Sequence, residues 1–230
     1  MIPLKKILFV SSFTLMTFMA SGQALTDIHI GLYSCFLSSD SLKSTPGPGL
    51  EIGARSQARI SRRLDFFSTY SVYFATFNVN GYHYTEDASF NPIVKNTSPT
   101  FDKIGLNYAV GIDYYIIPDK FSVGAGIGIA VNDIIGEAPL IDSLGAVPTS
   151  VQTMRSTAQV TDLEHFNFDY GVHANLIYRL PKVQFSLEYF KGFSSLTSGY
   201  NSSMNDIMLA VHFHLRDISY AKPYQNKLTK

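Results

Sequence analysis

The residues best equipped for chemistry are charged and polar side chains that recur at every second position along alternating segments. Those on the face opposite the bulky apolar residues are Glu51, Arg55, Asp113, Asp169, His173, Arg179, Glu188 and His212. Side chains two apart on an extended strand point to the same side. These groups would therefore meet in the interior of a barrel. Because unpaired buried charge is costly, we interpret them first as a polar network of ion pairs and second as a path for protons or ions.

The histidines are the candidates for a metal site or for catalysis. His212 and His214 place two imidazoles on one face of a strand, and His173 could lie near them. Three imidazoles can bind zinc, but histidines at this spacing are common on strands without metal, so we predict no metal and no cofactor. A serine hydrolase needs a serine within hydrogen-bond reach of a histidine, and we find no serine partner near either residue in sequence. We therefore predict no catalytic residues and no enzyme.

Composition excludes another class of function. The chain has 18 basic and 18 acidic residues and a formal net charge of zero. It contains no glycine-rich phosphate loop, no cysteine cluster and no basic patch in the sequence. These features give no reason to expect nucleic acid as a partner. Charged residues make up 16% of the chain, against roughly 25% in soluble domains.

The elements that must position these residues are strands, as the segment 104–131 indicates most clearly. Bulky apolar residues occupy alternate positions from Ile104 to Ile116, residues 118–120 form a turn, and the alternation resumes at Phe121. In a soluble barrel or sandwich the other face would carry solvated polar residues. Here it carries five glycines, at positions 105, 111, 124, 126 and 128. Glycine suits a crowded interior, which favours a transmembrane barrel whose apolar face meets lipid.

Eight segments alternate in this way, and the connections between them follow a pattern. The predicted strands are 27–36, 49–60, 66–78, 104–116, 121–131, 164–179, 183–189 and 207–215. The short connections are 61–65, 118–120 and 181–182, and long ones begin at Ser38, Asn80, Asp133 and Gly192. Outer-membrane barrels combine short periplasmic turns with long outer loops and an even strand number. The pattern therefore predicts an all-β fold, an eight-stranded antiparallel up-and-down transmembrane β-barrel, with both termini in the periplasm.

The N-terminus predicts export. Lys5 and Lys6 precede an apolar run over 7–19, and small residues follow at 20–22. This is typical of a secretory signal peptide. We divide the chain into a signal peptide over 1–22, an outer-membrane barrel over 23–216 and a periplasmic tail over 217–230. No later apolar run is long enough for a spanning helix.

The signal peptide, the eight strands and the run YYIIPDKFSVGAG at 114–126 resemble the small outer-membrane β-barrel domain family of Gram-negative bacteria. The resemblance covers nearly the whole mature chain. It implies the fold and a location in the bacterial cell outer membrane, and it implies no activity. The chain departs from many such barrels after Leu215, where a polar tail follows the last strand instead of a terminal aromatic residue; Phe213 is the nearest candidate for that residue.

The long connections are the candidate functional region, because loops of this length are usually functional or disordered. The segments 80–100 and 133–162 carry aromatic and apolar candidates for a binding surface: Tyr82, His83, Tyr84, Phe90, Ile134, Ile135 and Leu140. We expect a structural, surface-binding or assembly role, with outer-membrane lipid and lipopolysaccharide as partners and a surface protein or glycan as a candidate ligand. Two alternatives stay open, a small-solute or ion channel and an outer-membrane lipid-modifying enzyme.

Overall fold

The computed structural model describes residues 25–39, 43–86, 92–98, 100–135, 140–141, 160–161, 166–194 and 202–215. The predicted signal peptide and tail lie outside these ranges, as does Phe90, so the division of the chain into 1–22, 23–216 and 217–230 stays a prediction. Within the described ranges, no helix is long and apolar enough to cross a membrane.

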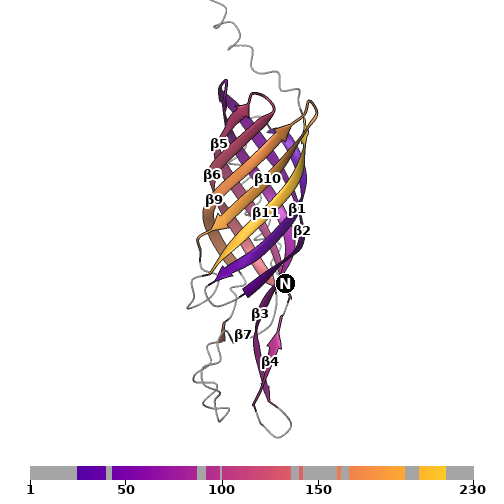
Figure 1. The fold of residues 1–230 in the computed structure, drawn as a ribbon, viewed down its shortest axis with the longest axis vertical. Helices are drawn as coiled ribbons and strands as arrows, with labels where there is room; N and C mark the ends of the chain where they lie inside the picture. The colour runs from indigo at the N-terminus through magenta and orange to yellow at the C-terminus, as the bar shows by residue number, and fades with distance from the viewer. Residues whose placement is uncertain are drawn as a thin grey trace, which may run out of the picture.

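Long antiparallel strands close into a barrel (Figure 1). They are β1 (Leu25–Ser39), β2 (Lys43–Ser61), β3 (Leu64–Glu86), β5 (Thr100–Ile117), β6 (Phe121–Ile135), β9 (Phe166–Arg179), β10 (Val183–Gly192) and β11 (Ser202–His214). Each pairs with the next in this order, and β11 pairs back with β1. The predicted eight-stranded up-and-down barrel is confirmed.

The hairpin of β5 and β6 forms as its alternation predicts. Val110 pairs with Ile127 and Gly111 with Gly126, so apolar and small residues lie opposite their own kind across the pair. The turn is closed by the Lys120 amide, which donates to the Ile117 carbonyl at 3.0 Å. Asp119 takes a φ of 59° there, a left-handed conformation that aspartate tolerates better than most residues.

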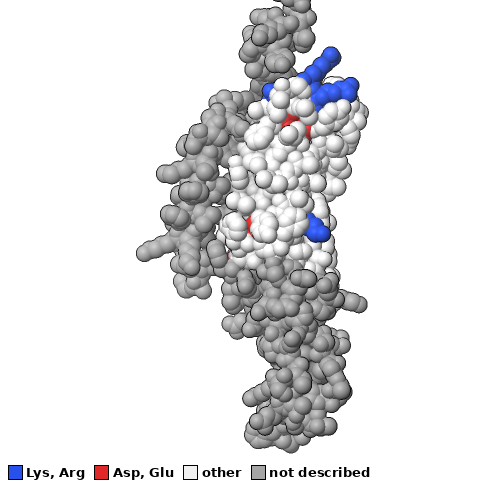
Figure 2. All heavy atoms as spheres, turned by 90° about the vertical axis from the view of Figure 1, so that its left-hand side faces the viewer, with Lys and Arg blue, Asp and Glu red and all other residues white. Residues whose placement is uncertain are grey.

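The outward face of the barrel is apolar. Ile127 is 67% exposed, Leu32 64% and Leu209 54%, and Figure 2 shows little charge between the two ends of the wall. Leu106 and Val110, also predicted outward, are half-buried. A continuous apolar surface of this kind is not stable in water, and a closed barrel leaves no strand edge unpaired in lipid. The barrel therefore spans a membrane.

Several strands are longer than predicted, and the four long connections predicted to begin at Ser38, Asn80, Asp133 and Gly192 all begin inside strands. β3 continues to Glu86 and pairs beyond the barrel with β4 (Pro92–Thr97), in register from Gly81↔Thr97 to Glu86↔Pro92. The short strands β7 (Leu140–Ile141) and β8 (Val160–Thr161) join at the same end, where Tyr82 pairs with Ile141. The sequence of this ribbon lacks the sustained apolar alternation of the barrel strands, so it resembled a loop.

Candidate functional site

The interior of the barrel brings the predicted polar residues together, and glycine provides the space. Gly124 on β6 lies opposite Asp113 on β5, and a Cβ atom at Gly124 would collide with the Asp113 carboxylate. The room is used by Arg55 from β2, whose Nη2 lies 2.7 Å from Asp113 Oδ2. Arg55 therefore reaches past β3, which lies between β2 and β5, to the carboxylate beside Gly124.

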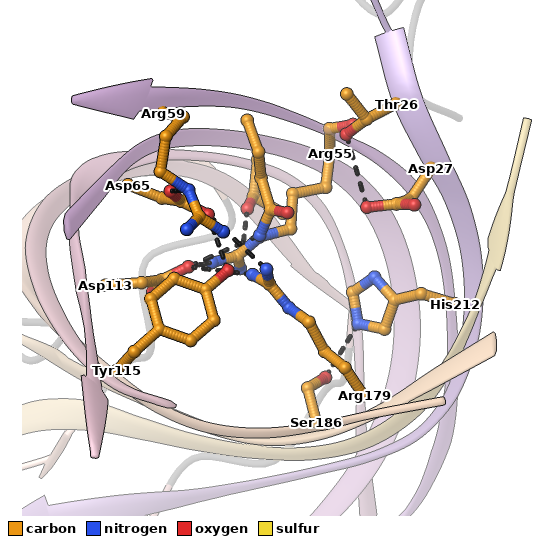
Figure 3. Close-up of polar contacts among 12 residues, drawn as sticks. Thr26, Asp27, Arg55, Arg59, Asp65, Asp113, Tyr115, Arg179, Ser186 and His212 are labelled. Carbon is orange, nitrogen blue, oxygen red and sulfur yellow. Dashed lines mark hydrogen bonds and ion pairs between the residues drawn. The ribbon is translucent and has the colours of Figure 1, made fainter. Parts of the chain in front are cut away.

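Around this pair lies a group that we call the arginine cluster: Arg55, Arg59, Asp65, Asp113 and Arg179 (Figure 3). Arg59 Nε lies 2.6 Å from Asp65 Oδ1, and Arg179 Nη1 donates to Asp65 Oδ2 at 3.4 Å. Arg179 Nη2 also lies 3.8 Å from Asp113 Oδ2. The cluster is closely tied because each carboxylate is shared by two guanidinium groups.

Tyr115 completes the arginine cluster. Its hydroxyl donates to Asp65 Oδ2 at 2.6 Å. The guanidinium carbons of Arg59 and Arg179 lie 4.6 and 4.7 Å from the centre of its ring. Cations over an aromatic face are attracted to it, and more so when desolvated. Tyr115 is fully buried, so its ring holds two like charges in place.

A second group, the histidine cluster, consists of His29, Glu51, His173, Glu188 and His212. Glu188 Oε2 lies 2.9 Å from His173 Nε2, and Glu188 Oε1 lies 3.6 Å from His212 Nε2. Glu51 lies 3.5 Å from His29. Glu188 comes close to His173 because it is paired in register with Asn175 on the neighbouring strand β9.

Acidic groups outnumber permanent cations in the described interior. The buried carboxylates are Asp27, Glu51, Asp65, Asp113, Asp169, Glu188 and Asp206. The buried Arg and Lys side chains are Arg55, Lys103 and Arg179, and Arg59 is partly buried beside them. The carboxylates of Asp27, Glu51 and Glu188 lie against the imidazoles of His214, His29 and His173, respectively.

The carboxylate of Asp169 is stabilised by backbone amides. Its Oδ1 accepts from the backbone amides of Phe193 and Ser194 at 3.0 and 2.9 Å. These donors come from the chain directly after β10 ends at Gly192. Asp169 therefore holds the end of a strand rather than a cation.

The other half of the interior is packed with apolar and aromatic side chains, which we call the outer plug. Its members are Tyr33, Cys35, Leu37, Tyr73, Ala75, Phe77, Val79, Phe101, Ile134, Met204, Met208 and Ala210. Tyr33 and Tyr73 stack with ring centres 4.5 Å apart, and Phe77 and Phe101 with centres 5.6 Å apart. This packing closes the lumen at the end from which the β3–β4 ribbon extends.

One ion pair lies within the outer plug. Lys103 Nζ lies 2.7 and 2.9 Å from the two carboxylate oxygens of Asp206, and it donates to the Tyr33 hydroxyl at 3.0 Å. It also lies 4.9 Å from the centre of the Tyr73 ring. Sequence reasoning missed Lys103 and Asp206, although each shares the parity of inward residues on its strand, because both strands begin earlier than predicted.

A small cavity separates the histidine cluster from the outer plug. Its volume is about 20 Å³, and Glu51, His173 and Glu188 line it together with Tyr33 and Asp206. A space of this size holds roughly one water molecule. It does not connect the two ends of the barrel, since the outer plug lies beyond it.

His212 has a serine partner that sequence reasoning did not find. Ser186 Oγ lies 2.7 Å from His212 Nε2 (Figure 3), because β10 and β11 are neighbours. Glu188 approaches the same nitrogen. A hydrolytic triad needs the serine and the acid on different ring nitrogens, and both Ser186 and His212 are buried. This contact therefore lacks the geometry of an activated nucleophile.

The eight predicted lumen residues are all buried in the barrel: Glu51, Arg55, Asp113, Asp169, His173, Arg179, Glu188 and His212. His214 lies on the same side of β11 as His212, as predicted, and its imidazole bonds to Asp27. Within the described ranges, no group of three or more His, Cys, Asp or Glu side chains is arranged to hold a metal ion.

The predicted loop residues have different outcomes. Tyr82, His83 and Tyr84 lie on the part of β3 that extends beyond the barrel, and Leu140 lies in β7. Ile135 ends β6 and is 45% exposed. The prediction that Ile134 belongs to an exposed loop is wrong: it is 1% exposed and packs in the outer plug, because β6 continues and its alternation turns this side chain inward.

Comparison with known proteins finds distant likenesses only. No protein-family model matches, and no curated protein matches significantly. Neisserial surface protein A (NspA) is 14% identical with a TM-score of 0.48, over 82% of this chain and 96% of that one. Ail, the attachment invasion locus protein of Yersinia pestis in complex with the heparin analogue sucrose octasulfate, is 10% identical with a TM-score of 0.43, over 83% and 99%.

The N-terminal β-barrel domain of Pseudomonas aeruginosa OprF is 7% identical with a TM-score of 0.30, over 83% of this chain and 100% of that domain. The fold assignment rests on this chain's own closed pairing and apolar wall, not on these likenesses.

Proposed function

We propose that this chain is a bacterial outer-membrane barrel without enzymatic activity, whose role is surface binding or assembly through its outer end. The observation that carries the proposal is the contrast between a filled interior and an elaborated end. Beyond the outer plug, β3 and β4 form a ribbon, and β7 and β8 join it (Figure 1). Closure of the barrel does not require these segments, and segments of this kind often carry the function of a protein.

The orientation follows from the connections. The turns at 62–63, 118–120 and 181–182 lie at one end of the barrel, and the ribbon lies at the other (Figure 1). In outer-membrane barrels the short turns face the periplasm. We therefore place the ribbon at the cell surface, with lipopolysaccharide around it and a surface protein or glycan as its ligand.

A channel is the less favoured alternative. The lumen of a barrel with this number of strands is filled by its own side chains, and here the outer plug closes one half while the two charged clusters fill the other. We expect planar-bilayer recordings of the folded protein to show no large, steady conductance. A porin-like conductance would favour the channel and make the lumen charges its selectivity filter.

A lipid-modifying enzyme is also less favoured. An enzyme of this kind needs a nucleophile or base that lipid can reach. The polar groups of the described interior point away from lipid and contact one another, as Ser186 and His212 do. Hydrolysis or acyl transfer on lipopolysaccharide by the folded barrel would contradict this interpretation.

The test removes the outer elements one at a time. In the first variant, 81–97 is replaced by Asn-Gly, which joins Asn80 to Ser98, whose side chains already meet at 2.6 Å. In the second, 136–165 is replaced by Asn-Gly, a site chosen so that Ile134 stays in the outer plug. Hairpin closure needs few residues, so both variants should still shift on unboiled SDS gels.

Binding is then measured with purified lipopolysaccharide and a glycan array as probes. We expect the parent to bind at least one probe and at least one truncated variant to lose that binding while its gel shift persists. The matched control is a substitution at the opposite end, Asp119→Asn, which should bind as the parent does. If both truncated variants keep all binding of the parent, the outer elements are not the functional surface.

A further inference from the structure

The short-turn end of the barrel carries exposed basic side chains. Arg62 and Arg63 form the β2–β3 turn, Lys120 lies in the β5–β6 turn and Lys182 in the β9–β10 turn, and all four are exposed. We call these four residues the basic rim. These residues are far apart in sequence, and the net charge of the chain gives no sign of them. The hairpins bring them to the same end of the barrel. Figure 2 shows Lys and Arg gathered at this end, at the top of the view.

Neighbouring strands fix the positions of these turns. The Arg63 carbonyl accepts from the Tyr115 amide at 2.9 Å, and the Lys120 carbonyl accepts from the Arg179 amide at 2.7 Å. The Lys182 carbonyl accepts from the His214 amide at 3.3 Å. The basic rim therefore lies along the edge of the barrel on short turns that are hydrogen-bonded to neighbouring strands.

The charge of the basic rim is not cancelled by its surroundings. Asp119 is the exposed acid in these turns, and its carboxylate lies 3.0 Å from Arg59 Nη2. Arg59 is held by Asp65 as well, so that pair belongs to the arginine cluster. In the described part of the chain, none of the four basic rim side chains forms an ion pair with a carboxylate.

The basic rim also adjoins the lipid-facing wall. Arg63 Nη1 donates to the hydroxyl of Tyr114 at 3.1 Å, and Tyr114 is 43% exposed on the outer face. Ile116, Ile117 and Leu180 beside the turns are exposed apolar residues. Basic side chains directly beside an apolar wall lie at the depth of lipid headgroups, as tyrosine does at membrane interfaces.

We propose that the basic rim binds the phosphate groups of anionic phospholipids in the leaflet at the short-turn end. Guanidinium and ammonium groups bind phosphate through charge-assisted hydrogen bonds. A basic residue at an anionic membrane surface contributes roughly a fivefold preference. The proposal rests on insertion of the barrel in a membrane and is independent of what the outer end binds.

The experiment measures lipid selectivity around the folded full-length barrel. The protein is refolded in phosphatidylcholine vesicles with trace spin-labelled phosphatidylglycerol or spin-labelled phosphatidylcholine, and the immobilised fraction of each label gives a relative association constant. Because only one leaflet meets the basic rim, we expect phosphatidylglycerol to be preferred about two- to threefold on average over the lipid shell. The preference should shrink in about 0.5 M NaCl, where screening is strong.

Two variants separate charge from structure. The variant R62Q/R63Q/K120Q/K182Q should reduce the ratio to about one, while R62K/R63K, which keeps the charge, should stay close to the parent. All four positions are exposed, and an unboiled gel shift verifies folding in each sample. Equal association of the two lipids with the parent would overturn the proposal, and so would an unchanged preference in the quadruple variant.

Discussion

The two halves of the barrel interior are stabilised by different forces. The short-turn half is held by the arginine and histidine clusters, in which carboxylates contact several arginine and histidine side chains. The outer half is held by stacked aromatic rings and aliphatic side chains, with the single pair of Lys103 and Asp206 inside. The comparison shows that a single lumen can be stabilised in two ways. Apolar packing closes it to solutes in the outer half, and charge pairing keeps it rigid in the short-turn half.

The same strands supply both halves, so the change occurs along each strand and not between them. β5 contributes Phe101 and Lys103 to the outer half and Asp113 and Tyr115 to the other. β11 likewise passes from Met204 to His212. On β5 and β11 the inward face is therefore richer in apolar side chains at the outer end than at the short-turn end, whereas β9 carries the buried polar residues Asn167 and Asp169 at its outer end.

The largest effect is expected in the arginine cluster. Asp113→Asn removes a charge that Arg55 and Arg179 both approach; Arg55 loses its nearest carboxylate, and Arg179 keeps its contact with Asp65. Breaking a buried pair costs several kcal/mol, and with two cations affected we expect about 5 kcal/mol of lost unfolding free energy. Urea unfolding of the protein folded in vesicles measures it. The exposed Asp119→Asn should cost less than about 1 kcal/mol; an equal cost for both would contradict the account.

The next effect tests whether the ion pair in the outer plug is needed. Lys103→Met leaves Asp206 buried without its cation, and we expect a loss of about 3–4 kcal/mol. The double variant K103M/D206L replaces both charges by apolar groups of similar size, which is often neutral or stabilising. It should therefore recover most of the loss in the same unfolding measurement. A double variant no better than K103M would show that charge holds the outer half too.

A smaller effect is expected on the wall, which serves both halves equally. Arginine in place of Ile127, at the middle of β6, should cost about 2–4 kcal/mol in vesicles. Arginine in place of Ile116, at the end of β5, should cost about 0–1 kcal/mol because its charge reaches the headgroups. Equal costs at the two sites would mean that the wall does not face a hydrocarbon layer.

Parity of apolar and polar residues predicted much of this molecule. It placed Ile127 outward and Asp113 inward beside Gly124. Side chains alternate with period two, so only one register of the strands keeps all apolar residues on the same face. It could not predict how far β3 and β6 extend, because the residues around Ile134 do not show where the strand ends and the connection begins. It also could not pair Ser186 with His212, because that contact depends on the register between β10 and β11.

The central claim, that a filled barrel turns its apolar face to lipid, is tested most directly by spin-label accessibility. Cys35 is replaced by alanine, and a single cysteine is introduced at Ile127 or, in a second protein, at Asp119, and labelled in vesicles. The account predicts that the label at 127 collides readily with oxygen and hardly with a water-soluble nickel complex, while the label at 119 meets the nickel complex freely. Free access of the nickel complex to the label at 127 would contradict it.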